Sequence, residues 1–133
     1  MTRQQRFLSN AYQKVTEVKN TEGESVWKKY GAYCHKLPAL IRACGLCQAL
    51  AYVQERADPN GGDQKKAMAL VLDHVAHTLG IQTDQLMDRI RGAEMVEYMH
   101  MTREVLSAWV YYKRFASSIL GVESAEGAES GGG

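Results

Sequence analysis

Proline, cysteine and long apolar runs are all scarce in this sequence, and each scarcity narrows the class of protein. Pro38 and Pro59 are the only two prolines, which leaves room for long helices. The three cysteines are an odd number, so a reducing cytoplasm is expected rather than a secreted disulfide framework. No apolar run approaches the roughly 18 residues of a membrane span, and the residues after Met1 do not resemble a signal peptide.

No single sign of charge dominates the 133 residues, whose formal net charge is +1. The distribution is uneven, because residues 1–122 hold all 16 basic side chains and 12 of the 15 acidic ones, a net charge of +4. The other three acidic residues are Glu123, Glu126 and Glu129. A mildly basic body is compatible with a nucleic-acid partner, although it does not by itself indicate one.

Apolar side chains recur at helical spacing along nearly the whole first half of the chain. This periodicity predicts a helix over 3–19, a second over 26–36 with Ser25 as its cap, and a third over 38–57. The break between the second and third helices is placed at Pro38, because proline disfavours helical geometry at the residue before it.

Glycine-containing turns divide the second half of the chain. The sequence Asp-Pro-Asn-Gly-Gly at 58–62 is the strongest turn signal. It predicts a helix over 63–79 that ends at Gly80, then a short helix over 83–91. The last helix is expected over 93–120, about 40 Å long at roughly 1.5 Å per residue.

The fold class predicted from these elements is all-α. Residues 1–121 are expected to form one domain, a bundle of about six helices with a long C-terminal helix. Residues 122–133 consist almost entirely of glycine, serine, alanine and glutamate, and are expected to be a disordered tail.

The last predicted helix carries two adjacent apolar rows, the main one alternating spacings of three and four residues. Such a helix is typical of the centre of a bundle, and a seam for a partner is the alternative. The main row is Tyr98, Met101, Val105, Ala108, Tyr112, Phe115 and Ile119, and the second row is Met99, Leu106 and Trp109.

The predicted helix over 38–57 has a row of small residues between two arginines, namely Arg42, Gly45, Ala49, Tyr52 and Arg56. Glycine inside a helix costs about 1 kcal/mol relative to alanine, so a contact or packing reason is expected. Either a backbone, of protein or nucleic acid, approaches closely there, or Gly45 lets a neighbouring helix pack close.

Four potential metal ligands occur in two pairs, each spaced three residues apart: Cys44 with Cys47, and His74 with His77. Tetrahedral zinc accepts such a set. A Cys-x-x-Cys sequence also occurs in thiol-redox proteins, where it follows a strand and opens a helix. Both pairs fall within predicted helices here, so buried structural residues are favoured and no metal or cofactor is expected.

Catalytic signatures are not found in the sequence. No nucleophile turn accompanies the scattered histidines, and no glycine-rich loop is suited to cradle a phosphate. The basic side chains gather in three places instead. Lys28, Lys29, Lys36 and Arg42 lie around the second and third predicted helices, Lys65 and Lys66 follow the turn at 58–62, and Lys113 and Arg114 lie near Tyr111, Tyr112 and Phe115. Cations bind phosphates and aromatic rings stack on bases, so these positions are candidates for a nucleic-acid contact.

Two segments together resemble a known family. The first is 29–51, with its Lys-Tyr-Gly, Lys-Leu-Pro and Gly-Leu sequences followed by Leu-Ala. The second is Tyr-Lys-Arg-Phe-Ala at 112–116, preceded on the same helix by Tyr98 and by Thr-Arg-Glu at 102–104. Over about residues 3–121 the chain resembles the small subunit of the Cmr complex, the type III-B CRISPR RNA-guided effector.

The resemblance implies an all-helical subunit without catalytic activity or cofactor, acting in antiviral defence in the cytoplasm of a prokaryote. The implied partners are the other subunits of the Cmr complex, copies of this chain aligned as a short filament, and guide and target RNA. No membrane is implied. The basic positions that match are Lys36, Arg42, Lys113 and Arg114, and the resemblance implies that they bind RNA.

The leading hypothesis is therefore a structural subunit of that complex which contacts the guide–target RNA duplex. A cysteine/histidine zinc or thiol-redox module is the alternative of a different class. A helical protein–protein adaptor without RNA binding is the third. Salt-dependent binding of RNA separates the first from the third, because phosphate contacts weaken as salt rises.

Overall fold

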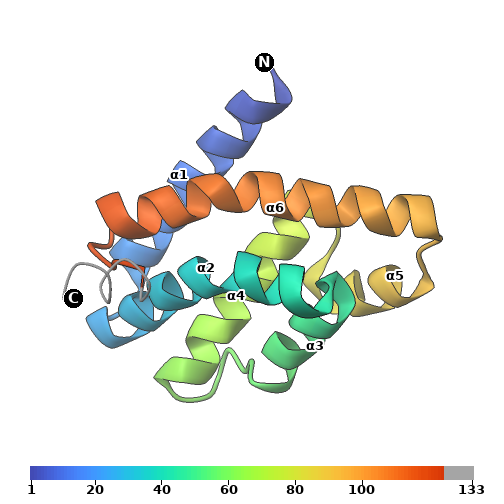
Figure 1. The fold of residues 1–133 in the computed structure, drawn as a ribbon. Helices are drawn as coiled ribbons and strands as arrows, with labels where there is room; N and C mark the ends of the chain where they lie inside the picture. The colour runs from blue at the N-terminus through green and yellow to red at the C-terminus, as the bar shows by residue number, and fades with distance from the viewer. Residues whose placement is uncertain (125–133) are drawn as a thin grey trace.

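The computed structural model describes residues 1–124, which form six α-helices and one 3₁₀ turn (Figure 1). No strand occurs within these residues, so the prediction of an all-α chain with about six helices and a long C-terminal helix is confirmed. In chain order the elements are α1 (Arg3–Thr21), α2 (Glu24–Cys44), α3 (Leu46–Glu55), α4 (Asp63–Leu79), η1 (Thr83–Gln85), α5 (Leu86–Gly92) and α6 (Met95–Ser118).

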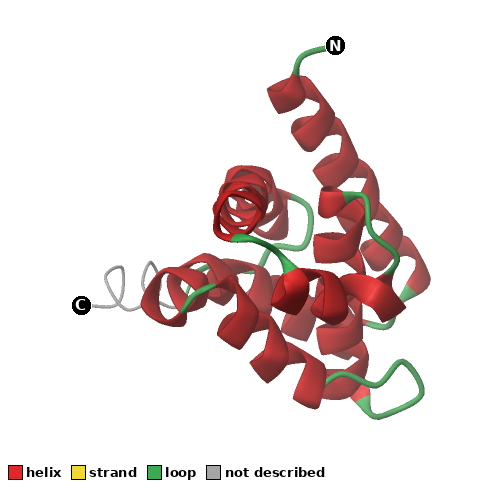
Figure 2. Cartoon of the chain, turned by 90° about the vertical axis from the view of Figure 1, so that its right-hand side faces the viewer, coloured by secondary structure: helices red, strands yellow, loops and turns green. Residues whose placement is uncertain are grey.

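Helix α6 lies along α2 and crosses α1 and α4 (Figure 1). The most extensive contacts join α1 to α6 and α2 to α4, while α3 packs against α2, α4 and α5. The N-terminal end of α1 projects beyond the other helices, as both views show (Figures 1 and 2). Within residues 1–124, no helix combines the length and apolarity needed to cross a membrane.

A stack of aromatic side chains joins α2, α4 and α6 at the centre of the core. The ring of Tyr112 lies between Trp109, at a centroid distance of 4.2 Å, and His74, at 5.8 Å. His74 in turn contacts α2, because its Nδ1 forms a 2.6 Å hydrogen bond with the hydroxyl of Tyr30. Burial lowers the pKa of His74 to about 3, with smaller contributions from Lys14 and His77, so the imidazole is neutral at physiological pH.

The break predicted at Pro38 is wrong, because α2 runs through this residue without interruption. Proline inside a helix removes one hydrogen bond and costs about 3 kcal/mol. Leu37, Pro38 and Ile41 are all buried, and their burial offsets this cost.

The break occurs instead at Gly45, between α2 and α3. Its φ of +86° is strained for any residue with a Cβ, and a Cβ here would lie 3.2 Å from the hydroxyl oxygen of Tyr98. The predicted row from Arg42 to Arg56 therefore does not lie on one helix. The sequence predicted that either a backbone or a neighbouring helix approaches Gly45 closely. The group that approaches it is the side-chain hydroxyl of Tyr98, which belongs to α6.

The other helix ends follow local signals. Thr2 and Gln5 form a reciprocal capping box at the start of α1. Helix α4 spans the predicted residues and closes at Gly80, whose φ is +70°. The prediction that Ser25 caps the second helix is wrong, because α2 begins at Glu24, two residues earlier than predicted, with Gly23 in the cap position and no side-chain hydrogen bond.

The apolar rows predicted for the last helix largely face the core. Met101, Val105, Ala108 and Tyr112 of the main row are buried, and so is Trp109 of the second. Met99, at 53% exposed, is the exception, because the N-terminal part of α6 extends past the core. Beyond Gly121 the chain stays on the surface of the bundle as far as Ser124, and the rest of the predicted tail lies outside the described residues.

Replacing Gly45 with alanine is expected to lower the free energy of unfolding by roughly 1–3 kcal/mol, because alanine cannot adopt this backbone conformation without strain. Urea unfolding followed by circular dichroism measures the change. Gly92→Ala is the matched control, since nothing lies within 4 Å of the added Cβ there. Equal stability of the two variants would contradict the role assigned to Gly45.

Stability is expected to fall as the pH decreases from 6.5 towards 3. The unfolded chain binds a proton on His74 below its ordinary pKa of 6.5, whereas the folded chain does so only near pH 3. The contribution of this residue is fully present above pH 6.5, and its loss is at most about 1.4 kcal/mol per pH unit.

Urea unfolding between pH 7.5 and pH 5 measures this dependence. His74→Gln should give a shallower slope than the unchanged protein. A His74→Gln slope as steep as that of the unchanged protein would mean that other groups control the acid response.

Candidate nucleic-acid interface

Three of the four basic residues predicted to bind RNA line one surface cavity. Lys36 and Arg42 project from α2 and Lys113 from α6, and the cavity that they share has a volume of about 710 Å³. Both residues of α2 lie in its C-terminal half. We call this cavity the basic groove.

The fourth residue, Arg114, lines an adjoining shallow cavity of about 580 Å³. Lys113, His35 and Ser124 line both cavities, so the two are parts of one surface. The structure therefore brings all four predicted positions together, although they are divided between two helices.

The four cations of this surface form no ion pair within the described residues, although Glu123 lines the shallow cavity together with Lys113 and Arg114. Among residues 1–124, none of the seven ion pairs involves Lys36, Arg42, Lys113 or Arg114. Six of the other twelve basic side chains lie within 4 Å of a carboxylate, as Nζ of Lys28 does at 2.9 Å from Oε1 of Glu24, and the other six are unpaired but do not line the basic groove. Unpaired cations are free to contact an anionic ligand, which makes this surface the candidate site for phosphates.

Two tyrosines also line the basic groove. Tyr33 is buried, and this burial raises the pKa of its hydroxyl to about 12. Tyr52, on α3, is 42% exposed, and the guanidinium carbon of Arg56 lies 3.6 Å from its ring centroid. An exposed aromatic ring beside unpaired cations is the combination by which proteins bind bases and backbone together.

The segment after α6 forms the edge of the basic groove because α2 holds it in place. Nε2 of His35 lies 2.7 Å from the carbonyl oxygen of Val122, which requires that this nitrogen carries the proton and donates. The hydroxyl of Ser117 donates to the same oxygen at 3.3 Å. The side chain of Val122 rests on Gly31, where an added Cβ would lie 2.9 Å from Cγ2 of the valine.

The cysteine and histidine pairs considered for zinc lie in different places. Cys44 and Cys47 face a second cavity between α2, α3 and α6, while His74 is in the core against Tyr30. His77 lies at a separate cavity beside α1 and α6. Within the described residues, no three histidine, cysteine or acidic side chains are grouped as metal ligands.

Known proteins resemble this chain over most of its length. Residues 3–119 match the family described as CRISPR-associated protein (Cas_Cmr5). A relative from Thermus thermophilus, named CRISPR system Cmr subunit Cmr5, is 38% identical over 120 residues, which are 90% of this chain and 96% of the relative.

The chain belongs to the Cas_Cmr5 family.

A solved member of the family has the same fold. The crystal structure of a CRISPR-associated Cmr5 family protein from Thermus thermophilus superposes with a TM-score of 0.72 at 35% identity. The match covers 89% of this chain and 96% of that one. All four predicted basic positions fall inside the region that matches the family.

Three residues of the surface were not predicted as functional. Tyr33 and His35 belong to the 29–51 segment without having been assigned a role, and Val122 was assigned to the tail. The sequence signal that could have identified His35 is its spacing from Arg42. The two residues are seven positions apart, which places them on one face of a helix that continues through Pro38. No sequence signal indicates that Val122 returns to α2.

Gly31→Ala is expected to displace Val122 and to lower the free energy of unfolding by about 1 kcal/mol, since adding a methyl group to a filled site forces its neighbours to move. Val122→Ala in the same chain removes the clashing methyl groups. The double variant should therefore lose less stability than the sum of the two single variants, as measured by a double-mutant cycle. Additive losses would show that the two side chains do not interact.

Proposed function

We propose that this chain is the small structural subunit of a type III-B CRISPR Cmr complex and that its basic groove contacts the guide–target RNA duplex. The chain acts without catalysis, in antiviral defence in the cytoplasm, while other subunits carry the reactions on RNA. Membership of the Cas_Cmr5 family supports the assignment to the complex. The observation that carries the RNA contact is the convergence of Lys36, Arg42 and Lys113 on one groove without acidic partners among residues 1–124.

The basic groove suits a duplex backbone better than a base-specific contact. Its cations come from α2 and α6, which lie side by side, so the positive charge is spread along two helices. Phosphate contacts of this kind position a protein on RNA without reading its sequence. A guide that differs from one complex to the next requires such a sequence-independent contact.

Several copies of the chain in a row are part of the proposal. The net charge of residues 1–122 is only +4, so a single copy offers few phosphate contacts. Copies aligned along one duplex add their contacts and raise the total affinity, because each further contact is made within the same complex. The exposed apolar residues Met95, Val96, Met99 and Val110 of α6 offer surface for contacts between subunits.

Charge reversal at Lys36 and Arg42 tests the RNA contact. The variant Lys36→Glu/Arg42→Glu is expressed in the native cells, the complex is purified through another subunit, and retention of target RNA is measured against salt. Both side chains are exposed, so the variant should fold and enter the complex normally. Retention should fall by roughly tenfold at low salt, and the salt slope should decrease by about 2, one for each phosphate-binding side chain that is replaced.

The matched control is Lys65→Glu/Arg103→Glu, which changes the net charge equally at exposed positions outside the basic groove. Its target retention should stay close to that of the unchanged complex. If both variants lost target RNA equally, the loss would result from the change in net charge and not from the basic groove. Normal retention of target RNA by the complex with the groove variant would favour the adaptor without RNA binding. Absence of the unchanged chain from the purified complex would overturn its assignment as a subunit.

A further inference from the structure

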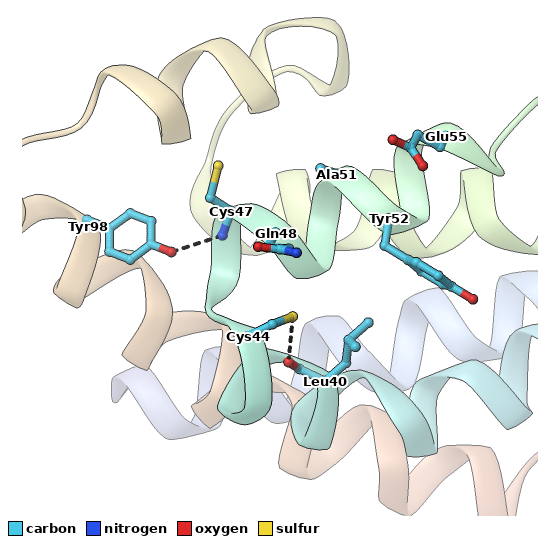
Figure 3. A pocket seen from close by; sticks show the side chains of 8 residues that line it. All are labelled: Leu40, Cys44, Cys47, Gln48, Ala51, Tyr52, Glu55 and Tyr98. Carbon is cyan, nitrogen blue, oxygen red and sulfur yellow. Dashed lines mark hydrogen bonds between the residues drawn. The ribbon is translucent and has the colours of Figure 1, made fainter.

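A second cavity lies next to the basic groove, at the break between α2 and α3. Its volume is about 620 Å³, within the range of roughly 300–1,000 Å³ typical of small-molecule pockets. Figure 3 shows Leu40 and Cys44 of α2 on the side of α3 where Gln48 and Tyr52 lie, with Tyr98 of α6 at one end. Gly45 opens this space, because the chain changes direction there. We call it the α3 pocket.

Tyr52 is the shared wall between the two cavities. It lines both the α3 pocket and the basic groove, as does Leu40. Arg56 lies over the Tyr52 ring and lines neither cavity, and its Nη1 donates to the backbone oxygen of Tyr52 at 3.1 Å. The arginine therefore supports the tyrosine from outside the cavities, and the remaining ring surface is available for stacking.

Hydrogen-bonding groups surround the rest of the α3 pocket. Gln48 is exposed and offers both a donor and an acceptor, and the carboxylate of Glu55 is an acceptor. The hydroxyl of Tyr98 accepts a 3.0 Å hydrogen bond from the backbone N–H of Cys47 (Figure 3). Its own proton has no acceptor among the described residues and can be donated to a ligand.

An aromatic wall, an edge of mixed donors and acceptors, and cations alongside form the chemistry that recognises an unpaired nucleotide. A base in the α3 pocket would place its phosphates over the wall formed by Leu40 and Tyr52, towards Lys36 and Arg42. An apolar side chain of a protein partner would use the apolar wall but not the neighbouring unpaired cations. The charge next to the pocket therefore favours RNA.

We propose that the α3 pocket binds one unpaired nucleobase of RNA, stacked on Tyr52, while the adjoining phosphates lie in the basic groove. The inference rests on the proposed RNA contact and adds to it a single-stranded element of the ligand. The duplex occupies the basic groove, and a base that leaves its helix at that point enters the α3 pocket.

Thiol footprinting of the full chain tests the proposal, because the cysteines already present report on the pocket. Cys44 is exposed at the pocket and Cys34 is completely buried, so alkylation by N-ethylmaleimide should modify the first and spare the second. A short single-stranded RNA should slow modification of Cys44, as measured by mass spectrometry. A fully paired RNA duplex of equal length should leave it unprotected, because it has no free base.

A single-stranded RNA containing 2-aminopurine measures the stacking on Tyr52 directly. Its fluorescence should decrease on binding to the unchanged chain and to Tyr52→Phe, which keeps the ring. Tyr52→Ala should abolish the decrease and weaken binding by about 5- to 150-fold, the range for loss of one stacked base. Tyr12→Ala removes an exposed tyrosine of α1 that lines neither the α3 pocket nor the basic groove, and should change neither quantity.

The results separate this inference from the proposed function. Loss of binding in Lys36→Glu/Arg42→Glu, together with unchanged binding in Tyr52→Ala, overturns the nucleobase pocket and leaves the duplex contact intact. No effect from either variant argues against both. Protection of Cys44 by the duplex, or by the other subunits of the complex without RNA, shows that the α3 pocket does not receive a free base. Failure of single-stranded RNA to protect Cys44 at any concentration also overturns the inference.

Discussion

The buried hydrogen bond between Tyr30 and His74 fixes how α2 and α4 lie against each other, and the stacked ring of Tyr112 extends this contact to α6. A polar pair in the core is costly to leave unpaired, so the three helices meet in one arrangement in which both groups are satisfied. The basic groove depends on that arrangement, because its cations come from α2 and α6. The contact among Tyr30, His74 and Tyr112 in the core therefore determines where the cations of α2 and α6 meet on the surface.

Gly45 is the second constraint, and it acts on the surface beside the groove. One residue with positive φ ends α2 and begins α3 at a new angle, and the hydroxyl of Tyr98 occupies the place where a side chain would otherwise lie. The same hydroxyl accepts a hydrogen bond from the first turn of α3. The turn, the start of α3 and the α3 pocket therefore depend on a contact with a residue more than fifty positions away.

The convergence of unpaired cations on two adjoining cavities gives the proposed RNA surface its character. Six of the twelve basic residues elsewhere, among them Lys28 and Arg89, lie within 4 Å of a carboxylate, and the other six are unpaired but do not line the basic groove. The four cations near α2 and α6 have no such partner within residues 1–124, and Tyr52 stands beside them with its ring exposed. Both proposals use this grouping: the unpaired charge for phosphates, and the ring for a base.

The sequence by itself determined the features whose causes are local. Helical periodicity predicted the all-α class, and the turn at 58–62 with Gly80 predicted both ends of α4, because these signals depend on near neighbours along the chain. The four basic positions came from the resemblance to the family.

Only the tertiary structure decided the features that join distant residues. Pro38 stays helical because its neighbours are buried, and the chain breaks at Gly45 because Tyr98 approaches there. Likewise, Val122 returns to Gly31 and His35, and Tyr52 becomes a wall between two cavities. Burial and contact between separate helices set these outcomes, and no pattern within one segment of the sequence encodes them.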